Sequence, residues 1–392
     1  IMRWTMFSFA VHLAFGLVIT GTGGAFANLL QAPDSFTYHR LAIRIVQHWT
    51  GDFPMPKLPA GKEGYYYLLA SLYWAFGAQP VAGLVVNAVL SASIVPLVTD
   101  TTRRLFGTAA ADRVPPLLLI LPSFMLWPSQ LIKEAPVLFL VAFAANCATR
   151  LTERFRMLPL AGLAAAMAVL LTFRGVVAVV LAGGFLTGVA FGRRQVLGGL
   201  GTGLGLASLI VLLLAFGVGY SAFDAAVNVN LEQADVVRRD VAVGAGTGFD
   251  ADVDISTSKR AVTYLPRGLV NFMLGPFPWQ IQGIRHMPVV LDVALWWCLI
   301  PSLWVGLRHA WWFLGRRMVL LVLPPFAAAC MLSLAVGNFG LLARERMQVL
   351  VLLFPLVALG LSLRAARRDV AAEPGSPSEP HDGEVPQRAQ VS

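Results

Sequence analysis

The sequence predicts an all-α integral membrane protein with about ten transmembrane helices and with interfacial or re-entrant segments on its outer face. Three observations predict this class. The chain has 392 residues, of which 57% are hydrophobic and 13% are charged. Its mean hydropathy is +0.69, and a soluble domain cannot bury that much apolar surface. Apolar stretches that approach the 20 or so residues of a membrane-spanning helix recur along the chain, and arginine clusters separate them.

The first apolar stretch, Met6–Leu30, is too long for a signal-peptide core, so we expect it to remain as the first helix. With ten crossings and the N-terminus inside, every arginine cluster falls on one side of the membrane, as the positive-inside rule requires. The predicted spans are 5–29, 81–102, 114–130, 134–149, 157–173, 175–192, 195–217, 288–307, 318–336 and 347–365. The arginine clusters are Arg103/Arg104, Arg150/Arg154/Arg156, Arg193/Arg194, Arg308/Arg316/Arg317 and Arg364/Arg367/Arg368.

This topology places Asp34 outside and Arg103 inside, so the stretch 64–102 can cross only once. We expect Gly64–Gly77 to lie in the interface or to re-enter the membrane, because its many aromatic residues suit that level of the bilayer. The alternative is a full short crossing with one other span miscounted. The chain then divides into a membrane domain, 1–368, and a disordered cytoplasmic tail, 369–392. The membrane domain includes a first outer loop at 33–80 and a large outer loop at 218–287.

The composition excludes several kinds of function. The net charge of +9 indicates topology and anionic lipid rather than nucleic acid in a membrane protein. The three cysteines lie inside apolar runs and have no disulfide or metal spacing. The acidic run at 250–254 lacks the glycine and the terminal glutamate of an EF-hand loop, and the Gly-rich run at 244–248 lacks the surroundings of a phosphate cradle. We therefore expect neither a metal nor a cofactor.

The segment after the first helix carries many ionisable residues next to the membrane. Asp34 comes first, and Phe36–Trp49 then has the pattern of an amphipathic helix on the outer leaflet. In one interpretation Asp34 is the general base of an inverting glycosyl transfer, which must take the acceptor's proton as the sugar carbon is attacked. In the other interpretation the segment is a solvated loop whose arginines contact lipid headgroups. The further candidate site residues of this segment are Tyr38, His39, Arg40, Lys62 and Glu63.

Other candidates follow on the outer side. Lys133 and Glu134 open a predicted helix, where a glutamate interacts favourably with the helix dipole. Arg344 and Arg346 lie at the outer end of the last helix, against the cytoplasmic arginine bias. They either pair with the acidic outer loop or bind an anionic polyprenyl phosphate, whose geometry a guanidinium matches. Arg174 lies at an external turn and is not counted among the site residues.

The stretch Tyr264–Gln282 contains three prolines, so we do not expect it to cross as a regular helix. Non-helical backbone at membrane depth survives only where it packs on protein or lines a wet cavity, so this stretch is expected to re-enter the membrane. Arg267, Trp279 and Gln280 are its candidate contacts for sugar or phosphate.

Three segments resemble the C-type membrane glycosyltransferases, in particular the bacterial family-39-like group that includes lipid A arabinosyltransferases and protein mannosyltransferases. PDSFTYHRLA at Pro33–Ala42 is similar to the Asp-x-x-x-Tyr-x-x-x-Ala segment after their first helix. Lys62–Gly77 is similar to their Tyr-rich stretch that ends in Phe-Gly, and Thr102–Gly107 is similar to their Arg-Arg-Leu-Phe-Gly. The match covers the first third of the chain and departs at Ser35, where many members have a glutamate.

The resemblance implies that Asp34 is the catalytic acidic residue, that Lys62 faces the lipid phosphate and that Glu134 is a second acidic residue of the cavity. The expected function is transfer of a sugar from a polyprenyl-phosphate carrier to a lipid, glycan or protein acceptor on the outer face of the bacterial inner membrane. The expected partners are this lipid-linked sugar, the acceptor and membrane lipids, without nucleic acid. A polysaccharide polymerase is the first alternative, and a lipid or glycan transporter or flippase is the second. A non-catalytic scaffold also stays open.

Overall fold

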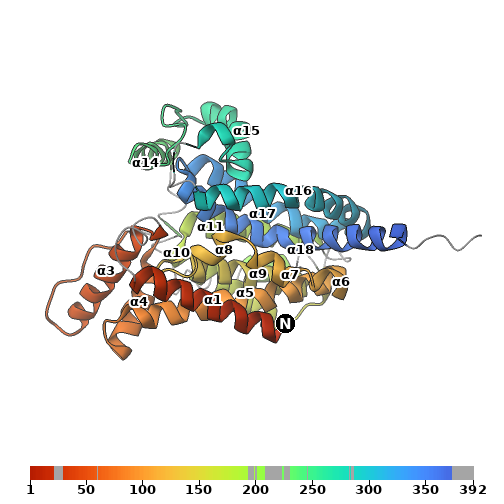
Figure 1. The fold of residues 1–392 in the computed structure, drawn as a ribbon. Helices are drawn as coiled ribbons and strands as arrows, with labels where there is room; N and C mark the ends of the chain where they lie inside the picture. Colours follow the sequence, from red (N-terminus) through yellow and green to blue (C-terminus); the bar gives the residue numbers. More distant parts are fainter. Residues whose placement is uncertain are drawn as a thin grey trace, which may run out of the picture.

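The computed structural model describes residues 1–21, 30–59, 61–192, 198, 201–207, 223–224, 230–244, 246–281, 283 and 287–372. These residues form helices joined by turns, and they contain no β-strand, which confirms the all-α class (Figure 1). Six helical stretches of the described chain are long and apolar enough to cross a membrane, and one of them, Val289–Ala335, contains two consecutive helices. The exact count of ten crossings stays a prediction.

The helices in chain order are α1 Met2–Gly21, α3 Asp34–Trp49, α4 Glu63–Phe76, α5 Pro80–Phe106, α6 Thr108–Ala111, α7 Val114–Leu119, α8 Pro122–Leu126, α9 Glu134–Glu153, α10 Met157–Phe173, α11 Gly175–Gly192, α14 Leu231–Val243, α15 Ser258–Leu274, the 3-10 turn η1 Pro278–Gln280, α16 Met287–Leu314, the 3-10 turn η3 Gly315–Arg317, α17 Met318–Ala335 and α18 Phe339–Ala372. The long helices form the bundle, and α3 and α4 lie at one of its ends (Figure 1). The N-terminus and α6 lie at the other end, and α14 and α15 stand out from the bundle.

Two predicted segments differ from the observed elements. The predicted span 114–130 is not one helix but the two short helices α7 and α8. The break has a local cause, because Pro122 disfavours the helical conformation at Leu121, whose ψ is 119°. The stretch Tyr264–Gln282 begins inside a regular helix, α15, which contains Pro266 and ends only at Leu274.

Some predictions fall on residues outside the described part of the chain. They are most of the predicted span 195–217, the cluster Arg193/Arg194, and residues 373–392 of the predicted tail. The described chain of α18 continues to Ala372, past the predicted start of the tail at 369.

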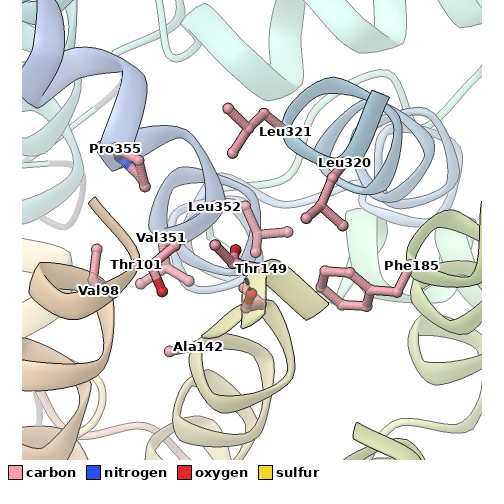
Figure 2. A pocket seen from close by; sticks show the side chains of 11 residues that line it. Val98, Thr101, Ala142, Thr149, Phe185, Leu320, Leu321, Val351, Leu352 and Pro355 are labelled. Carbon is pink, nitrogen blue, oxygen red and sulfur yellow. Dashed lines mark hydrogen bonds between the residues drawn. The ribbon is translucent and has the colours of Figure 1, made fainter. Parts of the chain in front are cut away.

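Apolar side chains fill the interior of the bundle. Figure 2 shows a cavity of about 20 Å³ between α5, α9, α11, α17 and α18, and the side chains around it include Thr101, Phe185, Leu320 and Leu352. A space of this size holds about one water molecule, so the middle of the bundle is closely packed.

Buried polar contacts join helices where apolar packing alone would leave their relative positions free. His12 of α1 is buried and makes a hydrogen bond of 3.0 Å to the carbonyl oxygen of Phe124 in α8. This contact is what we expect of a histidine that packs two helices together. The Asn87 amide of α5 donates to the carbonyl oxygens of Gln130 and Ile132. These contacts fix the turn that precedes α9, and α9 carries part of the site described next.

Candidate active site

Asp34 is the first residue of α3, where its carboxylate interacts favourably with the positive end of the helix dipole. Pro33 precedes it, and a proline is tolerated at a helix start because the missing N–H would have no partner there. The side chain of Asp34 is 56% exposed. More than half of this side chain is therefore open to the surroundings of the protein.

Arg344 of α18 joins Asp34 to Glu134. Its Nη1 and Nη2 atoms donate to Oδ2 of Asp34 at 3.2 Å and 3.1 Å. Its Nε and Nη2 atoms donate to Oε1 of Glu134 at 3.1 Å and 2.7 Å. The guanidinium carbon lies 5.7 Å from the ring centroid of Trp127, so an aromatic face also contacts the cation. One arginine thus brings together carboxylates from α3 and α9.

The charge network continues into the bundle beyond Glu134. Nη2 of Arg174 lies 3.1 Å from Oε1 of Glu134, and the same guanidinium pairs with Glu345. Glu345 in turn accepts a hydrogen bond of 2.6 Å from Gln348. The second oxygen of Glu134, Oε2, is buried and has no hydrogen-bond partner among the described residues. A buried carboxylate oxygen requires a donor, which water or a substrate hydroxyl can supply.

The start of α18 is held by the loop that precedes α15. The backbone N–H of Phe249 donates to the carbonyl oxygen of Gly337, and that of Phe339 donates to the carbonyl oxygen of Thr247. The rings of Phe249 and Phe339 stack with centroids 4.4 Å apart. Because Arg344 lies in the second turn of α18, this loop fixes the position from which the guanidinium reaches Asp34.

Aromatic residues of α3 and α4 form one wall of the site. The ring of Tyr38 contacts those of Tyr65 and Tyr66, with centroids 4.8 Å apart in each pair. Burial raises the pKa of the Tyr38 hydroxyl, and the charge of Glu134 raises it further. Tyr38 is therefore a neutral hydroxyl at physiological pH. His39 forms a hydrogen bond of 2.8 Å with the hydroxyl of Tyr73, and Arg40 is exposed on the surface of α3.

The two predicted lysines, Lys133 and Lys62, differ in their burial. Nζ of Lys133 donates to the carbonyl oxygen of Phe173 at 3.2 Å. Burial, together with the nearby charges of Arg174 and Lys62, holds the pKa of Lys133 well below its usual value. Lys62 is exposed, whereas Glu63 has a buried carboxylate oxygen, Oε2, without a partner in the described chain.

The remaining predicted residues form other contacts. Arg267 pairs with Asp250 and is 64% exposed. Trp279 is 78% exposed and stacks on Phe277, whose backbone N–H donates to Oε1 of Gln280. Among the described residues, no hydrogen bond or ion pair joins these three residues to Asp34 or Glu134. Arg346 is fully buried and pairs with Asp292 of α16 at 2.9 Å, on another side of α18 from Arg344.

Two charged residues outside the predicted site also form buried ion pairs. Arg174 was placed at an external turn, yet its side chain is only 13% exposed and pairs with two buried glutamates. Asp292 was overlooked within an apolar span. A single acidic residue in a membrane helix is itself a signal, because a charge there requires a partner. Among the described residues, no group of three or more histidine, cysteine or acidic side chains is arranged to hold a metal ion.

Comparison with known proteins gives a match in structure only. No family model and no curated protein matches the sequence. The ArnT protein of Cupriavidus metallidurans, solved bound to undecaprenyl phosphate, matches with a TM-score of 0.59 and 16% identity over 94% of this chain and 64% of its own. ArnT in the apo state matches with a TM-score of 0.58 and 16% identity over 94% and 62% of the two chains.

The archaeal oligosaccharyltransferase AglB of Archaeoglobus fulgidus, solved with an inhibitory peptide and a dolichol-phosphate, matches with a TM-score of 0.53 and 14% identity. That match covers 99% of this chain and 53% of AglB. The chain thus spans 64% of the length of ArnT and about half of the length of AglB. Identities this low support a shared fold. Both neighbours are C-type membrane glycosyltransferases, and the chain therefore has the C-type glycosyltransferase fold.

Proposed function

We propose that this protein is a membrane glycosyltransferase that moves a sugar from a polyprenyl-phosphate carrier to a lipid, glycan or protein acceptor on the outer face of the inner membrane. The observation that carries the proposal is the placement of Asp34. It is an exposed carboxylate at a helix start, and its partner Arg344 is itself anchored on the buried Glu134. A carboxylate held in this way is accessible to substrate and fixed in direction.

In the proposed reaction, Oδ1 of Asp34 accepts the proton of the acceptor hydroxyl, since the hydrogen bonds from Arg344 reach only Oδ2. The acceptor oxygen forms a bond to the anomeric carbon while the bond between that carbon and the phosphate oxygen breaks. The carrier leaves as polyprenyl phosphate, and the proton stays on Asp34 until water removes it. Arg344 is a positioning residue here, because it holds Asp34 next to the buried network.

The phosphate of the donor requires cationic side chains other than Arg344. A guanidinium has five N–H groups. The hydrogen bonds to Asp34 and Glu134 use four of them, namely the N–H of Nε, both N–H groups of Nη2 and one N–H of Nη1. Only one N–H, on Nη1, remains outside these contacts, so we do not assign the phosphate to Arg344. Lys62 is exposed and close enough to influence Lys133 electrostatically, so we assign it the main contact with the phosphate. Arg40 is a further exposed cation, on α3.

The structural neighbours support this substrate class. ArnT was solved with undecaprenyl phosphate, and AglB was solved with a dolichol-phosphate and a peptide. Both ligands are polyprenyl-type phosphates. Their presence in proteins of the same fold supports a lipid-phosphate donor for this chain, and the AglB peptide supports a macromolecular acceptor.

The test is a transfer assay with the full chain in liposomes that contain undecaprenyl phosphate linked to radiolabelled sugars, one sugar at a time, together with a membrane extract as the acceptor source. We expect one sugar to be transferred, with release of free undecaprenyl phosphate. Asp34→Asn should lower the rate at least 100-fold, the range that a general base contributes. Asp52→Asn, which changes an exposed aspartate just after α3, is the matched control and should leave the rate unchanged.

A normal rate for correctly folded Asp34→Asn would contradict the proposal. Products that carry many added sugars would instead indicate the polymerase. Movement of the labelled lipid across the bilayer without any bond transfer would indicate the flippase.

A further inference from the structure

A second hollow lies at the end of the bundle opposite to Asp34, and the proposed transfer reaction does not use it. It has a volume of about 390 Å³, within the range of small-ligand sites. The ends of α5 and α9, the start of α10 and the 3-10 turn η3 surround it. Five arginines and one glutamate supply its charged lining, which consists of Arg104, Arg150, Glu153, Arg154, Arg156 and Arg317.

The arginines of this hollow differ in their contacts. Arg104 and Arg150 pair with Asp100, and Arg104 also pairs with Glu153 at 2.9 Å. Arg154, Arg156 and Arg317 make no side-chain ion pair or hydrogen bond within the described part of the chain. Three cations on one hollow thus have no paired carboxylate among the described residues. Neighbouring arginines repel one another and together create a positive potential that attracts an anion.

The start of α10 adds to this preference for an anion. Its first turn contains no acidic residue, and its N-cap, Arg156, offers no side-chain acceptor. Leu158 and Pro159 of this turn line the hollow. The unpaired backbone N–H groups of a helix start favour a bound anion, and α10 is 17 residues long, so its dipole is fully developed.

Apolar side chains beside the arginines identify the class of anion. Phe155, Met157 and Leu158 are 43%, 70% and 84% exposed, and they are interleaved with Arg154 and Arg156. A water-soluble anion gains nothing from such neighbours. A phospholipid places its phosphate among the arginines while its acyl chains cover the apolar side chains, and basic pockets at the ends of membrane helices bind such headgroups.

We propose that this hollow, formed by α9, α10 and η3, binds the headgroup of an anionic phospholipid. Arg154, Arg156 and Arg317 contact the lipid phosphate, and Phe155, Met157 and Leu158 contact the upper acyl chains. If Asp34 faces outward as proposed above, the bound lipid belongs to the inner leaflet. The site is separate from the transfer reaction, so failure of either proposal leaves the other intact.

The test is native mass spectrometry of the full chain in detergent, titrated with phosphatidylglycerol or with phosphatidylcholine. We expect one phosphatidylglycerol to bind more tightly than all later ones, and phosphatidylcholine to show no such first site. Arg154→Gln/Arg156→Gln should weaken this first binding about 30-fold, from ~1 kcal/mol per charge at 1.4 kcal/mol per factor of ten. Arg317→Gln, on a different element, should weaken it about fivefold by the same conversion.

Arg367→Gln/Arg368→Gln is the matched control. It removes the same charge from exposed positions of α18 outside the hollow, and it should leave the first binding unchanged. Equal weakening in both double variants would overturn the proposal in favour of a general surface charge. Complete displacement of the lipid by millimolar inorganic phosphate would overturn it in favour of a free-anion site. Should the pocket double variant fold poorly, an unchanged first binding in Arg317→Gln would equally contradict the site.

Discussion

Arg344 is a single residue on which three helices depend for their relative positions. Its guanidinium contacts Asp34 of α3 and Glu134 of α9, and it belongs to α18 itself. Glu134 is 2% exposed, so its negative charge would be strongly unfavourable without a cation. The same ion pairs therefore hold the proposed base and stabilise the fold around it.

Replacement of Arg344 by glutamine should destabilise the protein by about 3 kcal/mol, the lower end for breaking a buried ion pair, because Arg174 still pairs with Glu134. The measurement is the thermal unfolding temperature of the full chain in detergent. Arg267→Gln breaks a pair whose arginine is 64% exposed, so it should change stability by less than about 1 kcal/mol. Equal shifts of the unfolding temperature in the two variants would show that the burial of the Arg344 ion pairs adds nothing to stability.

His39 should make stability depend on pH. Burial lowers the pKa of its imidazole below the ordinary value of 6.5 in the folded protein, so the unfolded chain takes up the proton first as pH falls. The contribution of the neutral, Tyr73-bonded ring is therefore complete above about pH 6.5 and is lost as pH falls through the lower, folded pKa. We expect the unfolding temperature of wild type to drop more between pH 7.5 and 5 than that of His39→Gln. Parallel pH profiles would contradict this role.

At the scale of the elements, α16 and α18 approach each other through glycines. A β-carbon on Gly360 would lie 1.8 Å from the carbonyl oxygen of Ser302, and one on Gly306 would lie 1.9 Å from that of Leu356. Small residues permit such close packing between membrane helices, where backbones can touch. Because α18 carries Arg344, this contact also determines how far the guanidinium reaches.

Gly360→Ala should therefore force the two helices apart and lower the unfolding temperature by several degrees. Gly183→Ala is the matched control, since a β-carbon there meets nothing within 4 Å and alanine favours the helix. Circular dichroism in detergent measures both variants. An unchanged unfolding temperature for Gly360→Ala would mean that α16 and α18 are less closely packed than described.

Asp292 and Arg346 connect the same two helices to the chain around them. Both side chains are fully buried, Arg346 also donates to the carbonyl oxygen of Gly275, and Asp292 accepts from the backbone N–H of Ser123. Asp292→Leu alone or Arg346→Met alone should cost about 3–5 kcal/mol, because each leaves one buried charge unpaired. The double variant should be more stable than either single variant. The measurement is a double-mutant cycle on the unfolding temperature. If the losses of the two single variants add up in the double variant, Asp292 and Arg346 do not stabilise the fold as a pair.

For the whole molecule, the sequence was sufficient to predict the all-α membrane class and to single out three charged residues that the structure brings into contact. Asp34, Glu134 and Arg344 were recognised because each places a charge at the outer end of a predicted span, and the structure brings the three into contact. The two neighbouring arginines of α18 could not be separated in the same way. Residues two apart on a helix differ by about 200° in direction, so Arg344 meets the site while Arg346 meets Asp292. The positions of α9 and α16 around α18 determine that Arg344 contacts Glu134 and that Arg346 contacts Asp292.

The outer loop shows why the rest was beyond prediction. Its prolines indicated broken backbone, yet Pro266 lies inside α15 because the helix begins two turns earlier, at Ser258. Arg267 was a candidate contact for sugar or phosphate, and the structure adds an ion pair with Asp250 of the same loop. Local sequence gives the types of the side chains, but long-range contacts decide which of them remain available to a ligand.

In the proposed reaction Arg344 acts through Asp34, so the two residues form one functional unit. The most direct measurement is a double-mutant cycle on the transfer rate with Asp34→Asn, Arg344→Gln and the double variant in liposomes. We expect the double variant to transfer sugar no more slowly than Asp34→Asn alone, because the rate losses of residues that act as a unit do not add. If the two losses instead multiply, Arg344 and Asp34 act independently, and the proposed site is contradicted.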